Sequence, residues 1–171
     1  METPIVNKVA QSPLLSLDLE DYLDQRENIQ FDLSQCLFQG IVLKEKDFRQ
    51  FIKEHDWNRY AGKNVGVHCS ADAIIPSWAY MLVATKLQPH ASLIVFGDKE
   101  ELEKARIDQA IDSLTQKEKL DNAKVVIKGC GNIDNRDYAY FQLTKRLTPL
   151  VSSLMYGEPC STVPVYKKPR P

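Results

Sequence analysis

Short, continuously apolar segments alternate with helical segments through the middle of the chain, and this alternation constrains the fold more than any other feature. The apolar segments lie at about 64–68, 93–97 and 124–129. Strands that are apolar on both faces and alternate with helices are typical of a parallel sheet covered by helices on both faces. We therefore predict an α/β fold in which these three strands are adjacent in one sheet and are joined by right-handed crossovers.

The helices between these strands are recognised by apolar side chains at spacings of three and four residues. The helix after the first strand carries Trp78, Met81, Leu82 and Thr85 at this spacing, and the helix after the second carries Ile107, Ala110, Ile111 and Leu114 on one stripe. A last helix is expected over about 140–154, bent at Pro149 and ending at Gly157. Pro164 places the final strand, 162–167, at a sheet edge or a bulge.

The first part of the chain predicts additions to this sheet. Residues 29–33 alternate apolar and polar side chains, and residues 41–43 are apolar after a glycine, which favours a β-hairpin-like strand pair. Residues 1–28 mix short apolar runs with charges and are expected to form an arm packed on the core or on a second subunit of a homodimer. A length of 171 residues then fits a single α/β domain over 29–166, with a loose tail at 167–171.

Charge and hydropathy exclude several classes of partner. The 22 basic and 23 acidic residues give a net charge of −1, so no global field favours nucleic acid or an anionic membrane. No apolar run approaches the roughly 18 residues of a membrane-spanning helix. The first residues, Met1-Glu2-Thr3-Pro4, have an acid where a secretory signal carries lysine or arginine. We expect a cytoplasmic protein with reduced cysteines, binding neither nucleic acid nor membranes.

Polar and sulfur-bearing residues follow each of the three predicted strands. Because the carboxyl ends of parallel strands meet where an α/β sheet opens its ligand crevice, we expect these residues to share one site. They are His68, Cys69, Ser70 and Asp72, then Gly97 and Asp98, then Gly129, Cys130 and Gly131. Cys160 lies in a proline-containing turn that the last helix could return to the same edge. Cys36 is expected to lie apart as a small packed side chain.

The leading hypothesis is a metal- or iron–sulfur-binding accessory protein. Three thiolates, from Cys69, Cys130 and Cys160, with a nitrogen or oxygen donor suit zinc, or an iron–sulfur cluster with one open iron. The cysteines are far apart in sequence, so only the fold can bring them together. The candidate cofactor-binding residues beside them are His68, Asp72, Asp98, Gly129 and Gly131.

Two other hypotheses stay open. In the first, the chain is a thiol enzyme or persulfide carrier with Cys69 as the nucleophile, because Cys69 precedes a helix whose dipole favours a thiolate. In the second, the chain is a structural adaptor without a catalytic centre, and its cysteines pack as small hydrophobic side chains.

Several segments of the chain resemble the domain of unknown function family numbered 2480, which is found mainly in Bacteroidetes. The distinctive segments are V-H-C-S-A-D-A-I-I-P at 67–76, K-G-C-G at 128–131 and G-E-P-C-S-T-V-P-V at 157–165, with shorter ones at 5–9, 17–20 and 46–49. The resemblance spans almost the whole chain and includes Cys69, Cys130 and Cys160, but not Cys36. It implies a bacterial protein whose partners are iron–sulfur assembly or sulfur-mobilising proteins.

Overall fold

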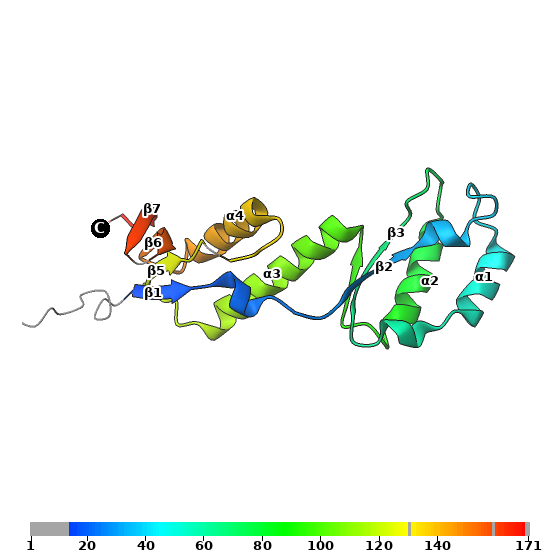
Figure 1. Cartoon of the computed structure of the whole chain (residues 1–171), viewed down its shortest axis with the longest axis horizontal. Coiled ribbons are helices and arrows are strands. Elements are labelled where there is room, and N and C mark those ends of the chain that lie inside the picture. Colours follow the sequence, from blue (N-terminus) through cyan, green and yellow to red (C-terminus); the bar gives the residue numbers. More distant parts are fainter. Residues whose placement is uncertain (1–13, 130, 159, 170–171) are drawn as a thin grey trace, which may run out of the picture. The chain divides into compact units, whose positions relative to one another are not determined.

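The computed structural model describes residues 14–129, 131–158 and 160–169 (Figure 1). Its strands form two sheets and are mostly parallel, so the α/β class is confirmed. The chain divides into two compact units. We call residues 25–105 the central unit, and residues 1–24 together with 106–171 the split unit.

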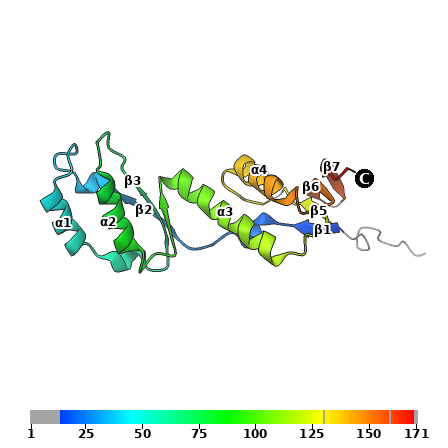
Figure 2. The same ribbon diagram turned by 180° about the vertical axis from the view of Figure 1, so that it is seen from behind.

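The central unit contains a parallel sheet with the strand order β2-β3-β4. The strands are β2 (Asn28–Asp32), β3 (Asn64–His68) and β4 (Leu93–Phe96). The helices are η2 (Leu33–Cys36), α1 (Glu45–Glu54), η3 (Trp57–Tyr60) and α2 (Ser77–Leu87). Figures 1 and 2 show α1 and α2 on the same side of β2 and β3. The buried core between them takes Val65 and Val67 from β3.

The opposite face of β3 needs a glycine. Gly66 pairs with Gln30 of β2 in the parallel register. A Cβ at residue 66 would lie 2.6 Å from the carboxamide of Gln30, so only glycine lets this side chain cross the strand undisturbed. The alternation of valine and glycine therefore separates a packed face from a face occupied by the Gln30 side chain.

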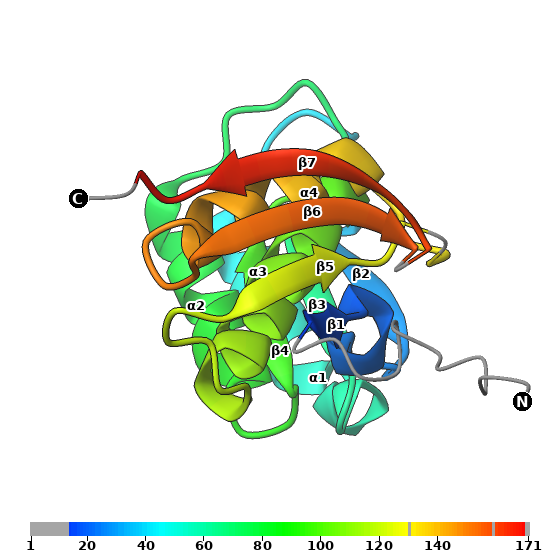
Figure 3. The same ribbon diagram turned by 90° about the vertical axis from the view of Figure 1, so that its left-hand side faces the viewer.

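The split unit contains a four-stranded sheet with the order β1-β5-β6-β7. The strands are β1 (Leu14–Leu17), β5 (Lys124–Ile127), β6 (Ser153–Glu158) and β7 (Ser161–Lys167). The helices are η1 (Leu19–Tyr22), α3 (Lys99–Lys117) and α4 (Arg136–Leu147). The first residues of α3 belong to the central unit. β1, β5 and β6 are parallel, and β7 returns antiparallel at the edge. Figure 3 looks onto this sheet and shows α4 behind it. The core includes the predicted stripe of α3, Ile107, Ala110, Ile111 and Leu114.

The prediction of one sheet is wrong. β3 and β4 are adjacent and parallel, but β5 belongs to the other sheet. The cause is β1, which lies in the segment expected to be an arm and pairs in parallel with β5 from Leu14 to Leu17. Residues 1–13 of that segment lie outside the described residues. Because compact units are defined by contacts rather than by independent folding, the predicted domain boundaries stay a prediction.

Two further expectations about single elements are wrong and one is confirmed. Residues 29–33 do not pair with 41–43; β2 pairs with β3 instead, and an isolated antiparallel bridge joins Phe38 to Val42. The last helix ends at Leu147, two residues before Pro149, and 153–158 is a strand. Pro164 does lie on the edge strand, and the register shifts between Leu154 and Met155 beside it.

Contacts extend past the last strand, where a loose tail is expected. The Lys168 backbone N–H donates to the Ser152 carbonyl at 2.9 Å, and its ammonium donates to Asn122 Oδ1 at 3.1 Å. None of the helices in the described residues is long and apolar enough to cross a membrane.

The strand β1 gives a test of this fold. Leu17 is 2% exposed in the split-unit core, so Leu17→Ala should lower the free energy of unfolding by about 2–5 kcal/mol in urea denaturation. The adjacent exposed position provides the control, because Ser16→Ala should change stability by no more than about 0.5 kcal/mol. Equal, negligible losses in both variants would show that this segment is a detachable arm rather than a strand.

Candidate functional site

The carboxylate of Asp32 joins the carboxyl ends of β2 and β3. It accepts hydrogen bonds from the Ser70 backbone N–H at 3.0 Å, the Ser70 hydroxyl at 2.5 Å and the Ser34 backbone N–H at 2.9 Å. Burial alone would raise the pKa of Asp32, but these hydrogen bonds outweigh it and hold the pKa well below its usual range. Asp32 is therefore an anion that ties the loop after β3 to the turn after β2.

Two thiols lie beside this carboxylate. Cys36 ends η2, Cys69 directly follows β3, and both are half-buried against the core of the central unit. Burial, with the negative charges of Asp32 and of an ionised Cys69, raises the pKa of Cys36 to about 12. The Cys69 thiol donates to the Ala71 carbonyl at 3.6 Å. Cys36, expected to lie apart, is thus close enough to Cys69 to sense its charge.

The aromatic ring of Tyr80, on α2, extends this group. Burial raises the pKa of its hydroxyl, as do the negative charges of Cys69 and Asp32. Tyr80 also packs edge-on against Phe96 at the end of β4, with ring centroids 5.0 Å apart. We call Asp32, Cys36, Cys69 and Ser70 the thiol–carboxylate cluster, and Tyr80 is an aromatic neighbour of it.

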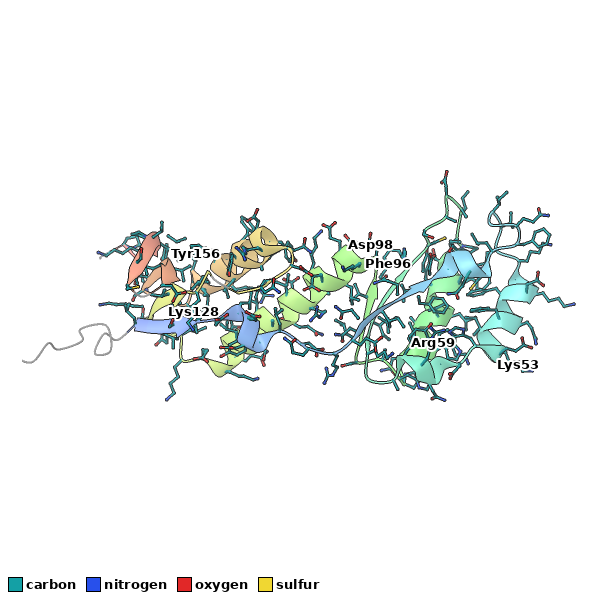
Figure 4. All side chains as sticks on the ribbon, in the orientation of Figure 1. Lys53, Arg59, Phe96, Asp98, Lys128 and Tyr156 are labelled. Carbon is teal, nitrogen blue, oxygen red and sulfur yellow. The ribbon has the colours of Figure 1, made fainter. Side chains whose placement is uncertain are left out.

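Other predicted residues of the central unit have separate roles. Asp98 precedes α3 and accepts from the Glu100 backbone N–H at 2.7 Å, as a helix cap does. Its pKa is lowered by a hydrogen bond with the Glu101 side chain, by the Glu100 N–H and by the charge of His68. Asp72 is exposed in the loop after β3. His68 therefore lies near the cap of α3, and Figure 4 labels Asp98 there beside Phe96.

The remaining predicted residues lie in the split unit. β5 and β6 are parallel, so the residues after β5 and the turn after β6, which contains Cys160, lie at the same sheet edge. Cys160 is exposed. A Cβ at Gly129 would lie 2.6 Å from the ring of Tyr156, and one at Gly131 would lie 3.2 Å from the Glu20 carboxylate. Both glycines therefore allow side chains to approach the backbone closely.

The structure thus divides the predicted site residues between two units. The argument from a common sheet edge does not hold for Cys69 and Cys160, because β3 and β6 belong to different sheets. Cys130 lies outside the described residues. Among the residues that are described, no group of three or more His, Cys, Asp or Glu side chains is arranged to hold a metal ion. The site formed by Cys69, Cys130 and Cys160 stays a prediction.

Asp32 and Cys36 were not identified as site residues from the sequence. Asp32 precedes Ser34 by two residues, a spacing typical of a capping turn, and this is the signal the sequence offers. The parallel register, in which Asp32 pairs with His68, is what brings Ser70 to it. That pairing is a tertiary feature and has no local signature.

Comparison with known proteins supports the resemblance seen in the sequence. The family described as Protein of unknown function (DUF2480) matches residues 3–168. The chain belongs to this family. No curated protein and no solved structure is significantly similar to it. Membership of DUF2480 covers both units, and the function has to be argued from the chemistry of the residues.

Asp32 gives the test of the cluster. Asp32→Asn should lower stability by about 1–3 kcal/mol at pH 7, because two backbone N–H donors and a hydroxyl lose a charged acceptor. The folded pKa is depressed, so the carboxylate contributes fully above its unfolded pKa of about 3.9, and its contribution falls as the pH drops toward the folded value. The difference in free energy of unfolding between wild type and variant, measured by urea denaturation, should therefore be smaller at pH 3 than at pH 7.

The exposed residue Asp72 is the matched control, and Asp72→Asn should leave stability unchanged at both pH values. If Asp32→Asn lowers the free energy of unfolding equally at pH 3 and pH 7, Asp32 is not a hydrogen-bonded anion in the folded protein.

Proposed function

We propose that the chain is a metal-binding accessory protein that holds a soft monovalent cation of the Cu(I) class through Cys36 and Cys69. The observation that carries the proposal is that two half-buried thiols follow neighbouring parallel strands, near enough to each other and to the Asp32 carboxylate for these charges to act on the Cys36 thiol. Thiolate sulfur is a soft ligand and selects Cu(I), zinc or iron–sulfur clusters over hard cations.

The charge beside Cys36 favours a cation over nucleophilic chemistry at this thiol. A nucleophilic cysteine requires electropositive surroundings that stabilise its thiolate. Here the Asp32 carboxylate does the opposite, and Cys36, with a pKa of about 12, stays protonated at neutral pH. A bound cation reverses this effect, since its positive charge displaces the thiol protons and is itself attracted to Asp32.

The number of ligands selects the kind of ion. A structural zinc ion takes four protein ligands, and a cubane or rhombic iron–sulfur cluster takes four cysteines. The described residues offer a pair of thiols here, and they contain no group of three or more His, Cys, Asp or Glu side chains that could hold a metal ion. A d¹⁰ monovalent ion that accepts two thiolates is the best match. Zinc or a cluster on Cys69, Cys130 and Cys160 is the competing proposal, and iron–sulfur assembly partners and a homodimer remain predictions.

The test is an anaerobic Cu(I) titration of the reduced protein against a chromogenic chelator. Wild type should bind a single Cu(I) ion, and Cys36→Ser and Cys69→Ser should each weaken binding by about 100-fold or more, since loss of a ligand exceeds the 10–100-fold effect of an outer-shell change. Cys160→Ser, which removes an exposed thiol of the other unit, should leave the affinity unchanged. Circular dichroism of each variant checks that the fold is retained.

Two results would contradict the proposal that Cys36 and Cys69 bind the ion. If Cys36→Ser binds as wild type while Cys69→Ser, Cys130→Ser and Cys160→Ser all lose binding, the ligands are those of the three-cysteine site. If folded, reduced wild-type protein does not compete with the chelator, the thiol pair is packing and the metal-binding proposal is wrong.

A further inference from the structure

A cavity of about 420 Å³ opens in the split unit. It lies between α4 and the strands β5, β6 and β7, and it reaches the carboxyl end of β5. Ligand sites of α/β proteins cluster at such strand ends, and sites for small molecules have volumes of about 300–1,000 Å³. The lining residues are Ile127, Arg136, Asp137, Tyr140, Phe141, Thr144, Tyr156 and Val165.

Three of the eight lining residues are aromatic. Tyr140 of α4 and Tyr156 of β6 meet edge to face, with centroids 5.2 Å apart and planes at 71°. The Tyr140 hydroxyl donates to the Lys128 carbonyl at 3.1 Å, which fixes this ring against the end of β5. Figure 4 labels Lys128, which follows β5, and Tyr156, which lies near the end of β6.

The position of Tyr156 depends on a glycine. Its ring occupies the space above Gly129, where a Cβ would lie 2.6 Å from the ring and the hydroxyl. Phe141 completes the apolar wall although its side chain is 70% exposed. An exposed aromatic side chain that lines a cavity is placed to contact a flat apolar group of a ligand.

The charged residues of the lining are one cation and one anion. Arg136 and Asp137 begin α4, and both are exposed at the cavity. The Arg136 guanidinium donates to the Gly131 carbonyl at 3.0 Å, and it has five N–H donors in all. A carboxylate on the ligand would complement Arg136, and an ammonium group would complement Asp137.

From this combination we infer that the split unit binds a small zwitterion with a flat apolar side group, of the aromatic α-amino acid class. The ring of the ligand packs against Tyr140, Phe141 and Tyr156. Its carboxylate pairs with Arg136 and its ammonium with Asp137. Thr144 of α4 also lines the cavity. The site is independent of the thiol–carboxylate cluster and would stand if that cluster bound no metal.

The test is isothermal titration of the full chain with L-phenylalanine. Saturable binding is expected. Two analogues test the charged groups of the ligand separately, because phenethylamine lacks the carboxylate and N-acetyl-L-phenylalanine lacks the ammonium charge. Each should bind about tenfold more weakly or worse, because each loses a charge-assisted hydrogen bond. Arg136→Met should remove the preference for phenylalanine over phenethylamine, and Asp137→Asn the preference over the acetylated analogue.

Two variants keep the test independent of folding. Thr144→Trp fills the cavity and should abolish binding while the circular dichroism spectrum is kept. Arg146→Met, on the same helix but paired with Asp112 outside the cavity, should bind as wild type. Absence of saturable binding to phenylalanine, equal binding of the acetylated analogue, or unchanged binding to Thr144→Trp would each overturn the inference.

Discussion

The parallel pairing of β2 with β3 is the constraint on which the candidate site depends. Its register sets Asp32 opposite His68, and the three hydrogen bonds that Asp32 accepts then fix the loop after β3 against the turn after β2. Cys36 and Cys69 are carried on those two segments. Each thiol lies in the segment that follows its own strand, so the pairing of the two strands is what brings the thiols near each other.

The same carboxylate organises structure and chemistry together. Asp32 stabilises the loop because its hydrogen bonds keep it ionised, and its charge adds to the effect of burial in keeping the neighbouring Cys36 thiol protonated. A carboxylate of this kind suits a site whose thiols stay protonated without a metal and lose their protons when a cation binds. The second unit follows a different design, in which aromatic rings and a pair of opposite charges surround a cavity.

The sequence predicted the elements better than their assembly. The stripe on α3 is buried as expected, because polar residues leave it a single apolar face. On α2 the expected stripe is right only in part. Trp78 and Leu82 pack against the core, but Met81 is 67% exposed. Ala79 and Val83 are buried instead, since this helix is apolar on most sides and periodicity cannot select a face. The separation into two sheets arises from the β1–β5 pairing, which joins segments more than 100 residues apart and leaves no local trace. Cys69 was identified, but Cys36 comes near it only through the β2–β3 pairing, which likewise leaves no local trace.

The central claim is that Cys36 and Cys69 share one site, and a dithiol-specific reagent tests it most directly. An aryl arsenoxide condenses with two thiols, releasing water, and forms a stable adduct when both sulfurs reach the same arsenic atom. Mass spectrometry of proteolytic fragments from the folded, reduced protein should find a single bridged adduct that links the peptides of Cys36 and Cys69. An adduct that links Cys69 to Cys130 or Cys160, or no bridged adduct at all, would contradict the account.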